Sequence, residues 1–148
     1  MNTTIIPFLI MFISVNIYSA ELNPNNYVHI HYCYFDNKRY AFAISLDEAK
    51  SMKVWNLNER EQTPVLPQEA ERLARKHIDS IKIPENYGWK LDSISLEPIN
   101  PFRLDKFIYT VQYSYYVNGP MTGVWPYMKY IITMDGKLID PIVDDYKM

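Results

Sequence analysis

Residues 106–116 read Lys-Phe-Ile-Tyr-Thr-Val-Gln-Tyr-Ser-Tyr-Tyr, and this stretch predicts the fold more directly than any other. Large apolar side chains alternate with smaller polar ones, which is the period of two that a β-strand requires. One predicted face carries Phe107, Tyr109, Val111, Tyr113 and Tyr115. The other carries Thr110, Gln112 and Ser114. The stretch therefore predicts a strand with one face toward a core.

The next strand is predicted over residues 127–134. Its expected core face consists of Met128, Tyr130, Ile132 and Met134. Asp135-Gly136 follows, and Asp-Gly between two apolar runs is a strong hairpin signal. We expect the turn to lead into a short last strand over residues 137–139, which Pro141 ends.

A further strand is predicted before the central one, over residues 89–96. Its alternation slips between Leu91 and Ile94, which predicts a β-bulge.

The clearest helix is predicted over residues 67–80. Pro67 suits its first turn, because the N–H group that proline lacks would have no partner inside the helix there. Acidic residues near the start and basic residues near the end both complement the helix dipole. One stripe at i, i+3, i+4 spacing predicts a packed face, made of Ala70, Leu73, Ala74, His77, Ile78 and Ile81.

The first half of the chain predicts a β-hairpin. Residues 27–35 alternate, the turn signal Asp36-Asn37-Lys38 follows, and residues 40–44 restart the alternation. Residues 46–53 are compatible with a short helix, and a polar connection leads on to the main helix. Together these elements predict one α+β domain over residues 21–148. Its expected fold is one main helix packed on a curved antiparallel sheet of four to six strands.

Four segments resemble a known arrangement: Pro64-Val-Leu-Pro-Gln-Glu-Ala-Glu-Arg-Leu-Ala, Trp89-Lys-Leu-Asp-Ser-Ile-Ser-Leu, Phe107-Ile-Tyr-Thr-Val and Met134-Asp-Gly-Lys-Leu-Ile-Asp-Pro. They look like small exported bacterial proteins of unknown function, and the arrangement resembles PepSY-like and cystatin-like domains, in which a sheet wraps one helix. The resemblance covers roughly residues 64–142. It implies a binding or inhibitory role in the cell envelope, and it supplies no site residues.

The N-terminus is typical of a signal peptide. Residues 5–17 form an apolar run of about thirteen, which is shorter than the roughly twenty residues of a membrane-spanning helix. Ser19 and Ala20 are small and polar residues follow, so we expect cleavage after one of the two. No Lys or Arg precedes the run, which departs from the usual pattern, and an uncleaved anchor or a buried first helix is the alternative. We expect a periplasmic or secreted protein with no stable membrane span after cleavage.

The composition excludes some classes of function. The chain is 48% hydrophobic and 22% charged, as a folded domain is, and its formal net charge is −2. No basic stripe is visible, so a nucleic-acid partner is not expected. No motif of a hydrolase, metalloprotease or phosphate-binding loop occurs, so neither an enzyme nor a cofactor is predicted.

Two patterns are candidate sites. His29, His31 and Cys33 share one face of a predicted strand, and two imidazoles with a thiolate suit zinc or copper. A half-buried sheet face with a buried thiol is the alternative interpretation.

The second pattern is the stretch Asn118–Pro126, which holds two glycines, two prolines and the candidate partner-binding residues Met121, Val124 and Trp125. Trp125 folded back over an open end of the core is the alternative. The sequence favours a non-enzymatic protein that binds a protein or peptide, for example as an inhibitor or accessory factor. A metal-binding protein and a small enzyme with an unrecognised site are the alternatives.

Overall fold

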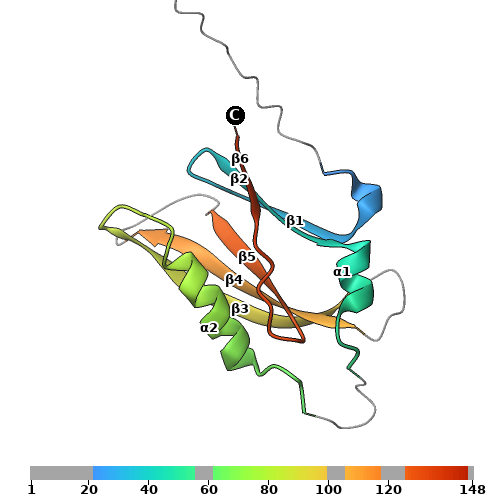
Figure 1. Cartoon of the computed structure of the whole chain (residues 1–148). Coiled ribbons are helices and arrows are strands. Elements are labelled where there is room, and N and C mark those ends of the chain that lie inside the picture. Colours follow the sequence, from blue (N-terminus) through green and yellow to red (C-terminus); the bar gives the residue numbers. More distant parts are fainter. Residues whose placement is uncertain (1–21, 56–61, 100–105, 118–125, 147–148) are drawn as a thin grey trace, which may run out of the picture.

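A computed structural model gives the fold, and it describes residues 22–55, 62–99, 106–117 and 126–146. A 3-10 turn, η1 (Pro24–Asn26), precedes the strands and helices (Figure 1). The elements are β1 (Tyr27–Phe35), β2 (Lys38–Ser45), α1 (Leu46–Ser51), α2 (Pro67–Ile78), β3 (Tyr87–Pro98), β4 (Phe107–Val117), β5 (Tyr127–Thr133) and β6 (Ile142–Asp145). The predicted signal peptide lies outside the described residues, so it stays a prediction.

The strands form two antiparallel three-stranded sheets, β1-β2-β6 and β3-β4-β5. We call them sheet A and sheet B. The expected fold, a cystatin-like or PepSY-like single curved sheet of four to six strands on one main helix, is therefore wrong. The chain is mostly β, and its two helices are separate: α2 lies against sheet B, while α1 continues from β2 at one end of sheet A (Figure 1).

The last part of the chain explains why one sheet becomes two. Residues 137–139 do return beside β5, where the Ile139 N–H donates to the Ile131 carbonyl at 2.9 Å. They form a single bridge, Ile132 with Leu138, instead of the predicted last strand. Pro141 has no N–H for a ladder, and beyond it the chain pairs with β2 as β6. Pro141 thus separates the segment that lies beside β5 of sheet B from β6, which belongs to sheet A.

Sheet B and α2 form most of the core. The predicted core faces of β4 and β5 are confirmed, because Val111, Tyr113 and Tyr130 are fully buried. On the opposite face of β4, Gln112 and Ser114 are partly covered, but Thr110 is only 2% exposed, so part of that face is buried as well. The predicted helix is also confirmed, with its last residue at Ile78. Its buried side chains are Ala70, Ala74 and Ile78, and the two alanines let the helix lie close to the aromatic face of the sheet.

Sheet A packs on sheet B by its inner face. Phe42 contacts Tyr130 with ring centroids 5.2 Å apart, and Phe35 contacts Trp89 at 5.0 Å. The main-chain N–H of Lys129 in β5 donates to the Cys33 thiol at 3.3 Å. The inner face of sheet A therefore packs over the edge of β5, and the described strands of sheet A do not join β5 in a backbone ladder.

The local turn chemistry follows the sequence. Asp36 and Asn37 have φ of 51° and 56°, values that Asn and Asp tolerate better than most residues, and they close the predicted hairpin. Gly136 has φ of 79° in the predicted turn after β5, where glycine adopts the left-handed region without strain. The predicted bulge is confirmed between Leu91 and Ser93.

A buried lysine ties α1 to sheet B. The Lys106 side chain is 4% exposed, and its ammonium group donates to the carbonyls of Lys50 and Met52 at the end of α1. These carbonyls have no partner inside the helix, so the lysine caps them. Across the four described ranges, no helix is long and apolar enough to cross a membrane.

Candidate functional site

His29, His31 and Cys33 lie on one face of β1, as predicted, but in different surroundings. Cys33 is 1% exposed, and burial raises its pKa to about 11. At neutral pH the group is therefore a protonated thiol, which is a poor nucleophile. This matches the alternative interpretation of Cys33 as a small buried side chain.

The two histidines face polar side chains of sheet B. Burial lowers the pKa of His29 and of His31. The negative charge of Glu97 opposes this shift, and the positive charge of Lys129 adds to it. Glu97 lies near both rings, and its Oε1 accepts from Thr110 at 2.6 Å and pairs with the Lys129 ammonium at 3.2 Å. The histidines thus lie at the junction of the two sheets, beside a half-buried ion pair.

The metal-site prediction gains no support from this geometry. Among the described residues, no group of three His, Cys, Asp or Glu side chains is arranged to hold a metal ion. His77, the remaining histidine, lies on α2. Its Nδ1 is 3.1 Å from the Tyr130 hydroxyl, so its ring packs between α2 and sheet B. A metal at His29, His31 and Cys33 stays a prediction.

The predicted partner-binding residues Met121, Val124 and Trp125 lie outside the described residues. Pro126, which follows Trp125 directly, lines a hollow of about 450 Å³ at the β1–β2 turn. Its other lining residues are Tyr34, Phe35, the turn residues 36–38 and Tyr146. We call this the turn hollow.

Three aromatic side chains, Tyr34, Phe35 and Tyr146, line the turn hollow beside Pro126 and the polar residues 36–38. The rings of Tyr34 and Tyr146 are 4.7 Å apart, and the two side chains are 47% and 39% exposed. The Tyr146 N–H donates to the Asn37 carbonyl at 2.7 Å, which fixes Tyr146 beside the turn. An exposed aromatic wall on a rigid hairpin can bind an apolar side chain of a partner. Sequence reasoning missed this site, because no local pattern links Tyr34 to Tyr146.

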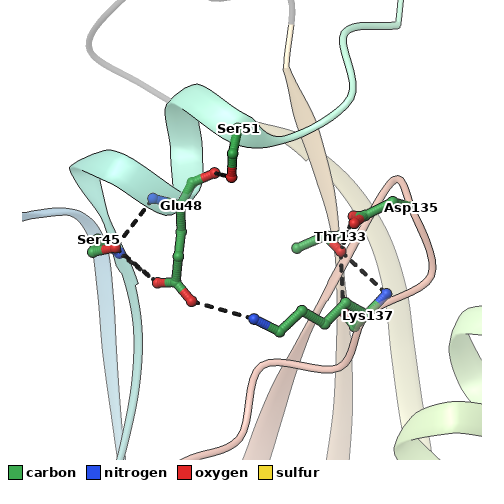
Figure 2. Close-up of polar contacts among 6 residues, drawn as sticks. All are labelled: Ser45, Glu48, Ser51, Thr133, Asp135 and Lys137. Atoms are coloured by element: carbon green, nitrogen blue, oxygen red, sulfur yellow. Dashed lines mark hydrogen bonds and ion pairs between the residues drawn. The ribbon is translucent and has the colours of Figure 1, made fainter.

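A second hollow of about 430 Å³ lies beside α1, and we call it the α1 hollow. It is lined by Tyr27, Ala43, Ser45, Glu48, Lys137, Ile139, Asp140 and Ile142. Figure 2 shows the polar side of this hollow, where Lys137 reaches from the turn after β5 to Glu48 of α1.

The polar groups of the α1 hollow are held in place by local bonds. Ser45 and Glu48 form a capping box: the Glu48 N–H donates to the Ser45 hydroxyl, and the Ser45 N–H donates to the Glu48 carboxylate at 3.0 Å. The Ser45 N–H bond lowers the pKa of Glu48, and the Lys137 ammonium, 3.4 Å away, favours the same ionised form. The Ser45 hydroxyl also donates to the Glu48 carboxylate at 2.9 Å, so it is part of the helix cap.

Comparison of the chain with protein-family models, with curated proteins and with solved structures found no significant match. The resemblance to PepSY-like domains therefore remains an expectation from the sequence.

Proposed function

We propose that this chain is an exported, non-enzymatic binding protein that holds a protein or peptide segment at the turn hollow. The observation that carries the proposal is the pair of exposed, touching rings of Tyr34 and Tyr146 in that hollow. Aromatic side chains supply large contact areas at small entropic cost, which is why they dominate binding hot spots.

Two further observations support this function. Pro126 joins the hollow to the segment that carries Met121, Val124 and Trp125, so the sequence-predicted binding residues directly precede its wall. Two potential nucleophiles of the described residues are also engaged: Cys33 is a buried thiol, and Ser45 is part of a helix cap. The signal-like N-terminus supports export to the periplasm or medium.

Site-specific photocrosslinking in the native host tests the proposal. A photoreactive phenylalanine analogue replaces Tyr34 in one strain and the exposed Lys90 of β3 in a matched control strain. We expect a recurrent protein adduct from position 34 that is absent from position 90. The same adducts from both positions, or none from position 34, would overturn the proposal.

Substitution of the hollow's aromatic wall gives a second readout. Tyr146→Ala removes an exposed ring, so we expect loss of the adduct with a change in unfolding free energy below about 1 kcal/mol. A large loss of stability would instead mark Tyr146 as a core residue.

A further inference from the structure

Strand β6 is an edge strand of sheet A in the part of the chain that the structure describes. Sheet A has the order β1-β2-β6, so β6 pairs with β2 on one side only, and no described strand pairs with its other side. The bond from the Tyr146 N–H to the Asn37 carbonyl marks these two residues as a hydrogen-bonded pair. Since such pairs alternate along an antiparallel ladder, Ile142 and Asp144 also turn their main chain toward β2. Val143 and Asp145 therefore point their N–H and C=O groups away from the sheet.

The side chains of this edge are also accessible. Ile142 and Val143 are 48% and 46% exposed. An exposed edge with free main-chain groups is a template for an added strand. Asp144 is bound by Arg39 through two hydrogen bonds, of 3.0 and 2.6 Å, which hold β6 firmly on β2. The edge is thus rigid enough to receive a strand without being displaced.

Charge argues against a second copy of this chain as the occupant. Asp140 and Asp145 are exposed next to this edge, whereas Asp144 is paired with Arg39, and two such edges paired side by side would bring the exposed carboxylates of the two copies near one another. The same charges favour a basic partner.

The two hollows lie at opposite ends of the strand. Tyr146 bounds the turn hollow and Ile142 bounds the α1 hollow. Residues four apart on a strand point to the same face and are about 13 Å apart, so one extended peptide spans both hollows. The turn hollow is aromatic and suits an apolar side chain. The α1 hollow carries the carboxylates Glu48 and Asp140 against one ammonium, Lys137, and suits a cation.

We propose that β6 binds an extended segment of a partner protein as an added antiparallel strand. The segment places an aromatic or aliphatic side chain opposite Tyr146 and, four residues later, a Lys or Arg opposite Ile142. This inference rests on the proposed function and names the chemistry of its partner.

The test selects peptides from a random heptapeptide display library on the protein isolated from its host. We expect the selected peptides to share an apolar residue followed four positions later by Lys or Arg. Val143→Pro removes an outward N–H without removing a bond to β2, and an edge strand tolerates proline there. It should weaken the best peptide at least tenfold, while the matched control Val143→Ala should change its affinity less than about threefold.

A second measurement covers the case in which Val143→Pro fails to fold, which circular dichroism detects. Peptides N-methylated at the nitrogens that would face β6 should lose binding, whereas methylation at the alternate nitrogens should not. Three results would overturn the inference. The selected peptides lack the four-residue spacing, no peptide is selected, or the affinity of the selected peptides is unchanged by Val143→Pro and by N-methylation. Dimerisation through β6, seen by sedimentation and lost in Val143→Pro, would also overturn it.

These variants distinguish a failure of this inference from a failure of the proposed function. Peptides that lose affinity with Tyr34→Ala but not with Val143→Pro would keep the turn hollow as the binding site and exclude strand addition.

Discussion

Strands β5 and β6 are separated only by residues 134–141, yet they have opposite environments. Met128, Tyr130 and Ile132 of β5 are fully buried, and the Tyr130 ring lies against Phe42 of sheet A and His77 of helix α2. Ile142 and Val143 of β6 are about half exposed. Strand β6 reads Ile-Val-Asp-Asp and lies at the edge of sheet A, whereas the core side chains of β5 are large and apolar. The difference is a division of labour: β5 stabilises the fold, and β6 presents an accessible edge.

The largest expected effect compares one isoleucine from each strand. Ile132→Ala leaves a cavity in the core and should lower the unfolding free energy by about 2–5 kcal/mol. Ile142→Ala should cost less than about 1 kcal/mol, because its side chain is already half in water. Denaturant unfolding of the two variants measures both. Equal losses would show that β6 belongs to the core.

The next effect concerns the turns of the two sheets. Gly136→Ala should destabilise by about 1–2 kcal/mol, because its φ of 79° strains any residue with a Cβ. Space is not the cause, since the nearest side-chain atom to an added Cβ, on Val65, is 3.8 Å away. Asn37→Gly in the β1–β2 turn should be neutral or slightly stabilising, because glycine suits its φ of 56°. Thermal unfolding measures both variants. An unchanged melting temperature in Gly136→Ala would contradict the turn geometry.

The junction between the sheets should respond to pH. Since the pKa values of His29 and His31 lie below their ordinary 6.5, the unfolded chain binds more protons than the folded one as the pH falls below that value. This part of the stability is fully present above about pH 6.5 and is lost as the pH falls through the lowered pKa values. The melting temperature should therefore be lower at about pH 5.5 than at about pH 7.5.

A double variant isolates this contribution. His29→Gln with His31→Gln should reduce the difference in melting temperature between the two pH values, whatever it does to stability itself. An unchanged difference would assign the pH dependence to other groups.

The smallest effect is expected at the α1 hollow. Lys137 and Glu48 form an ion pair whose side chains are 59% and 44% exposed, so solvent screens their attraction. Lys137→Gln should change the unfolding free energy by less than about 1 kcal/mol. A loss of several kcal/mol would show that this pair holds α1 in place.

The sequence predicted the elements of this fold better than their assembly. The strands β1 to β5, the main helix, the bulge after Leu91 and the Asp135-Gly136 turn follow from local periodicity and turn chemistry. The last strand predicted over residues 137–139 is a single bridge instead, and β6 was not predicted. The pairing of β2 with β6 does not, because it joins residues as far apart as Arg39 and Asp144, which are 105 positions apart. Unless the pairing of β2 with β6 is known, the alternation in the sequence is equally compatible with one sheet and with two sheets.

The same limit applies to the candidate sites. Alternation placed His29, His31 and Cys33 on one face of β1, but the ion pair of Glu97 and Lys129 beside the histidines comes from two distant strands. The turn hollow depends on Tyr34 and Tyr146, which meet only through the pairing of β2 with β6. Local patterns can identify a face of a strand, but not what lies opposite it.

Amide hydrogen exchange with and without the best selected peptide tests the division of labour between β5 and β6 most directly. Without peptide, the amides of Tyr130 and Ile132, whose N–H groups point toward β4, should exchange far more slowly than those of Val143 and Asp145, whose N–H groups point away from β2. With peptide, Val143 and Asp145 should become protected while β5 stays unchanged. Protection of Val143 in the free protein, or peptide binding that leaves Val143 and Asp145 unprotected, would contradict the account.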